Sequence, residues 1–196
     1  MKMIRSFIAL DLSPEILGGL DAIMHQMSQR LPGSIVRWTP ARNIHLTLKF
    51  LGEVAENNLD GLFEIARRAA EQQPVFQLRV SGLGAFPSLN RPRVLWAGVQ
   101  APSELSALQR AIEFETARLG YPGEEREFSP HLTIGRISRN ASPEEARQAG
   151  SLLGSLQTGD LGICNMEQVH FYRSDLNPGG ARYTRLYSAA LSNLKR

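Results

Sequence analysis

Two short stretches decide how this chain folds: His45-Leu46-Thr47-Leu48 and His131-Leu132-Thr133-Ile134. Both read histidine, aliphatic residue, threonine, aliphatic residue, and they contain two of the four histidines in the chain. Side chains alternate between the two faces of a β-strand, so the histidine and threonine of each stretch share one face. Each stretch is therefore predicted to be a strand that buries its aliphatic face and presents an imidazole beside a hydroxyl.

The positions of the two copies predict a molecule with two lobes. One copy falls in each half of the 196-residue chain. Amphipathic helical segments alternate with strand-like segments around them, and the sequence contains neither a G-x-G-x-x-G loop nor a Walker sequence. We therefore expect an α+β fold. It is predicted as a single domain over residues 1–196, bilobal, with pseudo-twofold related antiparallel sheets and outer helices around a central cleft.

The remaining elements follow from periodicity and capping residues. Strands are expected at residues 4–10, 35–39, 44–51, 76–80, 93–99, 131–137, 162–172 and 183–191. Helices are expected from residue 14 to about 30, from within 53–58 to about 73, from 103 to about 119, and from 143 onward. Ser13 before Pro14, and Ser142 with Glu145, are predicted helix caps. The Gly- and Pro-rich residues 82–92 are predicted to form a loop.

If the two motif strands meet in the cleft, their polar faces form one site. The candidate catalytic residues are His45 and His131, with Thr47 and Thr133 as candidate phosphate-binding residues. Opening a cyclic phosphodiester requires a base that activates water and an acid that protonates the departing oxygen, and histidine can fill either role near neutral pH. Threonine hydroxyls can donate hydrogen bonds to the non-bridging oxygens. The near-symmetric motifs leave open which histidine is the acid.

Arg136 is a further candidate for phosphate binding, five residues after His131. A guanidinium can bind phosphate through two parallel hydrogen bonds. Strict alternation places Arg136 on the strand face opposite His131, so its side chain reaches the cleft only if the strand bends near Gly135. The first copy has Phe50 at the same offset, so the two lobes are not equivalent.

Other polar and aromatic residues have weaker support. His25 and His170 lie outside any repeated pattern and are expected to be structural. Base stacking requires an aromatic side chain at the edge of a cleft, and backbone phosphates attract arginine. The candidates are Phe50, Trp96 and Tyr172 for stacking, and Arg91 and Arg93 for phosphates.

Composition narrows the class of protein. Cys164 is the single cysteine, which excludes an intramolecular disulfide and a thiolate metal cluster. No zinc-binding or nucleophilic-serine motif is present, so we expect neither a metal nor a cofactor. The 22 basic against 19 acidic residues favour a polyanionic partner. No apolar run suits a membrane span or a signal peptide, so we expect a cytoplasmic monomer without membrane contact.

The two motifs resemble those of the 2H phosphoesterase superfamily, which is named for its two histidines. The similarity is greatest to the bacterial RNA 2′,3′-cyclic phosphodiesterases, historically also called 2′-5′ RNA ligases, and it extends over nearly the whole chain. The stretches that carry it are residues 5–12, 43–54, 93–99, 128–136 and 171–174, with Tyr183-Thr184 behind them.

This resemblance implies a bilobal fold and metal-free hydrolysis of a terminal 2′,3′-cyclic phosphate to a 2′-phosphomonoester. It implies His45 as the proton donor to the leaving 3′ oxygen and His131 as the acceptor that activates water. Thr47, Thr133 and Arg136 would hold the phosphate. The expected substrates are RNA ends with a 2′,3′-cyclic phosphate, or small cyclic nucleotides. Reversible 2′-5′ RNA ligation at the same site, and nucleotide binding without catalysis, remain open as alternatives.

Overall fold

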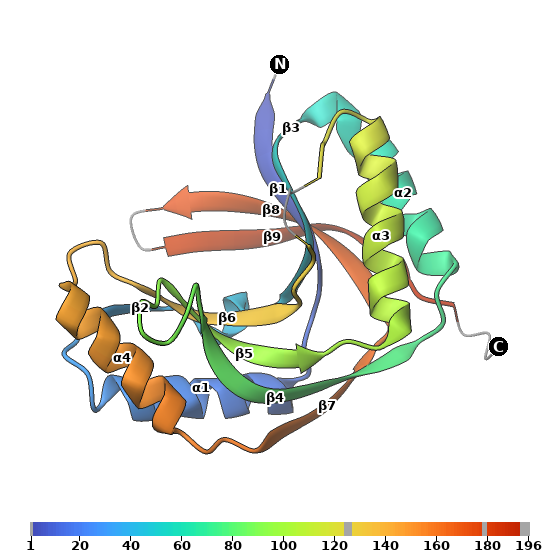
Figure 1. Cartoon of the computed structure of the whole chain (residues 1–196). Helices are drawn as coiled ribbons and strands as arrows, with labels where there is room; N and C mark the ends of the chain where they lie inside the picture. Colours follow the sequence, from blue (N-terminus) through green and yellow to red (C-terminus); the bar gives the residue numbers. More distant parts are fainter. Residues whose placement is uncertain (1, 124–126, 178–179, 193–196) are drawn as a thin grey trace.

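The computed structural model describes residues 2–123, 127–177 and 180–192. Within these residues the predicted α+β class is confirmed, with four α-helices and two antiparallel sheets (Figure 1). Sheet A has the order β3-β1-β8-β9, formed by β1 (Met3–Leu10), β3 (Leu46–Ala55), β8 (Gln168–Asn177) and β9 (Gly180–Ala190). Sheet B has the order β2-β6-β5-β4-β7, formed by β2 (Val36–Trp38), β4 (Phe76–Phe86), β5 (Val94–Gln100), β6 (His131–Ile137) and β7 (Asp160–Met166).

The helices form two pairs, one on each sheet. They are α1 (Pro14–Ser28), α2 (Leu59–Glu71), α3 (Ser103–Arg118) and α4 (Pro143–Ser155). Helices α2 and α3 pack against strands of sheet A, whereas α1 packs against β7 and α4 against β4 of sheet B. The lobes are therefore not the two halves of the chain: α1 follows β1 but covers sheet B, and β8 and β9 return to sheet A (Figure 1).

Both predicted helix caps are present. The Ser13 hydroxyl oxygen accepts a hydrogen bond from the Ile16 amide at 3.5 Å, ahead of Pro14 at the first helical position. At α4 the Ser142 hydroxyl oxygen accepts from the Glu145 amide at 3.2 Å, and the Glu145 carboxylate accepts from the Ser142 amide at 2.7 Å. These side chains satisfy amide groups that the first turn of a helix otherwise leaves without partners.

The expected strand at 162–172 is wrong: it is two strands in different sheets. Strand β7 ends at Met166 and pairs with β4, whereas β8 begins at Gln168 and pairs with β1 and β9. The chain passes from one sheet to the other at Glu167, whose carbonyl accepts from the Leu191 amide at 2.7 Å. Met166 and Gln168, on either side of Glu167, both remain in strands. The change of sheet therefore needs no turn, and no glycine or proline marks it in the sequence.

The expected loop at 82–92 is also partly wrong, because β4 continues to Phe86. Gly84 lies beneath the ring of Trp96, and a Cβ there would stand 2.3 Å from two ring carbons. This glycine makes room for an indole rather than for a turn. The first helical turn before α2 is a short 3-10 segment, η2 (Glu56–Asn58), because residues 53–55 still belong to β3.

The aliphatic faces of both motifs lie in the core, as predicted. The solvent-exposed fraction is 0% for Leu46, 3% for Leu48, and 0% for both Leu132 and Ile134. Buried residues of both sheets and all four helices form one continuous cluster. Over the part of the chain that is described, no helix combines the length and apolarity needed to cross a membrane.

Candidate active site

The two motif strands belong to different sheets and contact one another. Strand β3 is the edge of sheet A, and β6 contacts it from sheet B. His45 immediately precedes β3 and His131 is the first residue of β6. Both histidines and both threonines, Thr47 and Thr133, are half-buried, while the aliphatic residues between them are buried. Each of the two contacting strands thus carries a half-buried histidine and a half-buried threonine.

Each motif strand carries a bulge at the same residue of the motif. In β3, Thr47 pairs with Ala9 and Lys49 with Ile8, so Leu48 is the extra residue. A bulge places two residues opposite one and resets the alternation of side chains along the strand.

The second motif repeats this irregularity. Thr133 pairs with Trp96 and Gly135 with Leu95, which leaves Ile134 as the extra residue. The two strands therefore share a bulge at the fourth residue of the motif, as a pseudo-twofold relation requires, whereas β3 alone has a second register shift between its pairings with Ser6 and Phe7.

The bulge in β6 determines where Arg136 points. His131, Thr133 and Arg136 pair with Gly98, Trp96 and Val94, which alternate along β5 and so share one face. Arg136 therefore lies on the same side as His131. Burial raises the pKa of Tyr183 in sheet A, and the positive charge of Arg136 acts in the opposite direction.

Gly135 allows this close packing. It is buried, and a Cβ there would stand 2.8 Å from Cγ1 of Val36 and 3.1 Å from a ring carbon of Trp38. The bend near Gly135 on which the expected placement of Arg136 depended is present in the structure as the bulge at Ile134.

His45 lies among aromatic rings. The Phe7 ring stacks on the imidazole with centroids 4.6 Å apart, and the Tyr183 ring meets it edge-on at 5.2 Å. Burial lowers the pKa of His45 to about 4, even though the charge of Asp11 and a hydrogen bond with the Asn43 backbone act in the opposite direction. The free protein therefore holds His45 neutral at pH 7.

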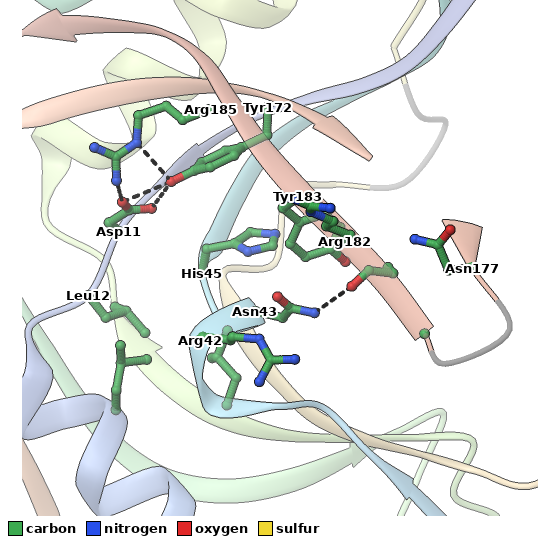
Figure 2. A pocket seen from close by; sticks show the side chains of 14 residues that line it. Asp11, Leu12, Arg42, Asn43, His45, Tyr172, Asn177, Arg182, Tyr183 and Arg185 are labelled. Atoms are coloured by element: carbon green, nitrogen blue, oxygen red, sulfur yellow. Dashed lines mark hydrogen bonds and ion pairs between the residues drawn. The ribbon is translucent and has the colours of Figure 1, made fainter. Parts of the chain in front are cut away.

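Asp11 is the carboxylate of this site, and the sequence did not point to it. The pairing of Leu10 with Leu46 places the next residues, Asp11 and His45, across from one another. Nη2 of Arg185 donates to Oδ2 of Asp11 at 2.5 Å, and the Tyr172 hydroxyl donates to its two oxygens at 2.7 and 2.9 Å (Figure 2). Asp11 is thus already bound by Arg185 and Tyr172.

Tyr172 and His170 both lie next to the Asp11 carboxylate. Burial, followed by the hydrogen bond to Asp11, raises the pKa of Tyr172 to about 12, so its hydroxyl keeps its proton. Nε2 of His170 lies 3.6 Å from Asp11, and its Nδ1 lies 2.9 Å from the Ser188 hydroxyl. Burial lowers the pKa of His170, which favours a neutral imidazole held between these two groups.

His131 is held by its own backbone. Its Nδ1 lies 2.8 Å from the carbonyl oxygen of Ser129, and its ring meets Phe86 edge-on with centroids 4.9 Å apart. With Nδ1 as the donor, Nε2 of the neutral ring is left as an acceptor. Asn43 and Ser129 both stand two residues before a motif histidine, so each imidazole is anchored by the backbone at the same offset.

The weaker candidates differ in their surroundings. Phe50 is 54% exposed and its ring lies 6.1 Å from that of Phe7. Trp96 lies on the same face of sheet B as Thr133, and its Nε1 has no hydrogen-bond partner among the described residues. Arg91 and Arg93 are exposed in the segment that leads into β5, and His25 is exposed on α1.

A cavity of about 600 Å³ opens beside His45 (Figure 2). Its wall includes Asp11, Tyr183 and Arg42, the last of these in the 3-10 segment η1 (Ala41–Asn43), but it does not include His131. No group of three or more histidine, cysteine or acidic residues within the described ranges could hold a metal ion.

The chain is similar to known phosphoesterases over more than nine-tenths of its length. A family model described as LigT like Phosphoesterase matches residues 10–96, which include the first motif. The RNA 2′,3′-cyclic phosphodiesterase of Methanothermobacter thermautotrophicus is 32% identical, over 92% of this chain and 95% of its own length. The chain belongs to the LigT-like phosphoesterase family. The sequence-based assignment to the 2H superfamily is thereby confirmed.

Solved structures agree with this membership. This LigT-like chain superimposes on Escherichia coli LigT complexed with 3′-AMP with a TM-score of 0.75 at 30% identity, covering 97% of this chain and 99% of that one. It matches TT0787 of Thermus thermophilus with a TM-score of 0.80 at 27% identity, covering 96% and 98% of the two chains. The Thermotoga maritima RNA 2′,3′-cyclic phosphodiesterase is 32% identical over 93% of each chain.

Proposed function

We propose that this LigT-like phosphoesterase hydrolyses the 2′,3′-cyclic phosphate at the end of an RNA to a 2′-phosphomonoester, with His45 and His131 as its acid–base pair. The observation that carries the proposal is the contact between two strands of different sheets that share a bulge at the fourth residue of the motif, each with an imidazole beside a hydroxyl. Relatives at 32% identity are named RNA 2′,3′-cyclic phosphodiesterase, which supports the same reaction.

The one-sided cavity supports an assignment of the two histidines. Water attacks phosphorus from the side opposite the departing 3′ oxygen, so the base and the acid stand on opposite sides of the phosphate. The departing oxygen belongs to the ribose, so the acid must lie on the side that has room for a nucleoside. The cavity is lined by His45 and not by His131. His45 is therefore the proton donor and His131 the base.

The step balances with these two groups. Nε2 of His131, left free by the contact between Nδ1 and Ser129, takes a proton from water as the water oxygen bonds to phosphorus. The bond between phosphorus and O3′ breaks, and O3′ takes the proton of His45. The hydroxyls of Thr47 and Thr133 and the guanidinium of Arg136 hold the non-bridging oxygens, where negative charge accumulates.

The low pKa of His45 constrains this mechanism. An acid must carry its proton, yet burial lowers the pKa of the free imidazole to about 4. The cyclic phosphate is an anion, and an opposite charge in contact with an imidazole favours its protonated form. Substrate binding therefore raises the pKa of His45, so that the imidazole is protonated when the cyclic phosphate is in place.

The two imidazoles supply every proton transfer, so the proposed reaction needs no metal and no cofactor. The proposed substrates are RNA ends with a 2′,3′-cyclic phosphate or small cyclic nucleotides. A single domain, a monomeric state and a cytoplasmic location remain predictions. Sedimentation of the purified protein and imaging of a tagged chain in cells would check the last two.

Alanine variants test the histidine pair. His45→Ala and His131→Ala should each reduce the hydrolysis rate by about 10²–10⁴-fold in the presence of EDTA, the usual contribution of one general acid or base. His25→Ala, on the exposed side of α1, serves as the control and should leave the rate unchanged. Either motif variant retaining more than a tenth of the activity would contradict the mechanism, as would joining of two RNA halves in place of hydrolysis.

A further inference from the structure

The cavity beside His45 is larger and more basic than one reacting phosphate requires. Its volume is about 600 Å³, within the range of about 300–1,000 Å³ typical of small-ligand sites. Three arginines line it, Arg42, Arg182 and Arg185, against one acidic residue, Asp11. Arg185 is bound to Asp11, so these two charges offset one another. The positive charge that remains belongs to Arg42 and Arg182.

These two arginines are free to bind a ligand. Both side chains are exposed, and neither has an ion pair or a side-chain hydrogen bond to another described residue. In the view of Figure 2 they lie on the side of His45 away from the pair formed by Asp11 and Arg185. Other exposed arginines, such as Arg110, also lack an acidic partner among the described residues, so Arg42 and Arg182 are distinguished by their shared position in the cavity wall. Two unpaired guanidiniums on one concave wall favour an anionic ligand.

The position of the two arginines is built into the fold. Arg42 belongs to η1, three residues before His45, and Arg182 belongs to β9 next to Tyr183, whose ring contacts His45. The amide nitrogen of the Asn43 side chain donates to the carbonyl oxygen of Ala181 at 2.8 Å. This hydrogen bond joins the residues adjacent to the two arginines, and so it holds η1 against β9 across the cavity.

We propose that the cavity takes the RNA strand that precedes the reacting end, with Arg42 and Arg182 binding the internucleotide phosphate on the 5′ side of the terminal nucleoside. This step rests on the proposed function, because it takes the departing ribose to lie on the side of His45. The next negative charge on that side of the substrate is the phosphate attached to the 5′ oxygen of the same ribose. The substrate class is therefore an RNA chain in preference to a nucleoside cyclic phosphate.

Three substrates test this inference: a nucleoside 2′,3′-cyclic phosphate, the same compound with a 5′-phosphate, and a dinucleotide ending in the same cyclic phosphate. The measured quantity is kcat/KM of each of the two longer substrates divided by that of the nucleoside compound, which has no 5′-phosphate. We expect this ratio to be about tenfold or more for both, equivalent to about 1.4 kcal/mol. Because the contact is between charges, the ratio should fall as salt is raised from about 50 to 500 mM.

Substitution of the arginines identifies the contact. Arg42→Ala with Arg182→Ala should bring both ratios close to one, and using ratios removes any effect on the chemical step. Arg110→Ala, an exposed position on α3 outside the cavity wall, is the matched control and should keep the wild-type ratios.

The outcomes separate this inference from the proposed function. Failure to cleave any of the three substrates would overturn the proposed function. Cleavage of all three with ratios near one would leave that function in place and overturn the strand site. A high ratio that survives both substitutions would overturn the assignment to Arg42 and Arg182. A gain with the dinucleotide alone would assign the preference to the second nucleoside and overturn the phosphate contact.

Discussion

Nδ1 of His131 lies 2.8 Å from the carbonyl oxygen of Ser129. A carbonyl only accepts, so Nδ1 must carry the proton and Nε2 of the neutral ring must carry the lone pair. A hydrogen bond with the Asn43 backbone, at the same offset in the first motif, acts to raise the pKa of His45. The His131 ring is therefore oriented by its own backbone before any substrate is present.

The first prediction concerns this tautomer. At a pH where His131 is neutral, its Nε2 should give the 15N chemical shift of an unprotonated ring nitrogen and its Nδ1 that of a protonated one. Nitrogen-15 NMR of histidine-labelled protein measures both, with His131→Gln used to assign the signals. An unprotonated Nδ1 would contradict the assignment of Nε2 as the base.

The second prediction concerns the pKa of His45. Burial disfavours the charged ring, so the imidazole should gain its proton only as the pH falls through about 4. Asp11→Asn removes the charge that raises this pKa, so the midpoint should fall further. A bound phosphate ligand should shift the midpoint upward. NMR titration of the His45 ring measures all three, and a midpoint near 6.5 in the free protein would contradict the account.

The third prediction concerns the effect of the lowered His45 pKa on the free energy of unfolding. Between the ordinary pKa of 6.5 and the folded value of about 4, the unfolded chain binds a proton at His45 that the folded chain does not. This group's contribution to the free energy of unfolding is therefore full above pH 6.5 and is lost as the pH falls toward 4. His45→Gln should show a weaker loss over this range in urea titrations. If the free energy of unfolding fell equally with pH in the two proteins, the lowered pKa of His45 would be contradicted.

The fourth prediction concerns Arg136, which the bulge at Ile134 turns toward the side of His131. Arg136→Ala should reduce kcat/KM on the order of 100-fold, the usual effect of removing a donor to a charged transition state. Arg136→Lys should recover only part of this, since lysine keeps the charge but lacks the two-pronged geometry. Arg139→Ala, exposed beyond the end of β6, is the control. Equal activity of the lysine variant and the wild type would contradict bidentate binding.

The fifth prediction concerns a buried charge on β3. Lys49 is 3% exposed, and its Nζ lies 2.5 Å from Glu113 of α3 and 2.7 Å from the carbonyl oxygen of Pro122. Glu113→Ala leaves this ammonium without its counterion and should lower the free energy of unfolding by about 3 kcal/mol. Glu56→Ala, in the exposed pair with Lys2, should cost less than about 1 kcal/mol. Urea denaturation that gave equal losses would contradict the buried role of Lys49.

Local patterns predicted local structure well. The alternation in His45-Leu46-Thr47-Leu48 identified the buried face of β3, and Ser142 with Glu145 identified the start of α4. Both signals act between residues that are neighbours in the chain, so a single sequence contains all the information they need. The expected strand at 162–172 failed because the change of sheet at Glu167 is decided by pairing partners far away in sequence.

The parts of the site that could not be predicted are long-range. Asp11 and Arg185 are 174 positions apart in the chain, and no periodicity connects them. The cavity likewise depends on Asn43 meeting Ala181, 138 positions later. The position of Arg136 was predictable only in part. Gly135 suggested a bend in the strand, but only the register with β5 shows which way the Arg136 side chain turns.

The most direct test of the central claim is 31P NMR of a short RNA bearing a 2′,3′-cyclic phosphate, incubated with the protein in EDTA. The two-histidine account predicts complete conversion of the cyclic signal to that of a 2′-phosphomonoester, with no 3′ isomer. A 3′-phosphate product would contradict the assignment of O3′ as the departing oxygen on the side of His45. An unchanged cyclic signal that disappears only when a divalent metal is added would contradict the histidine pair as a sufficient catalyst.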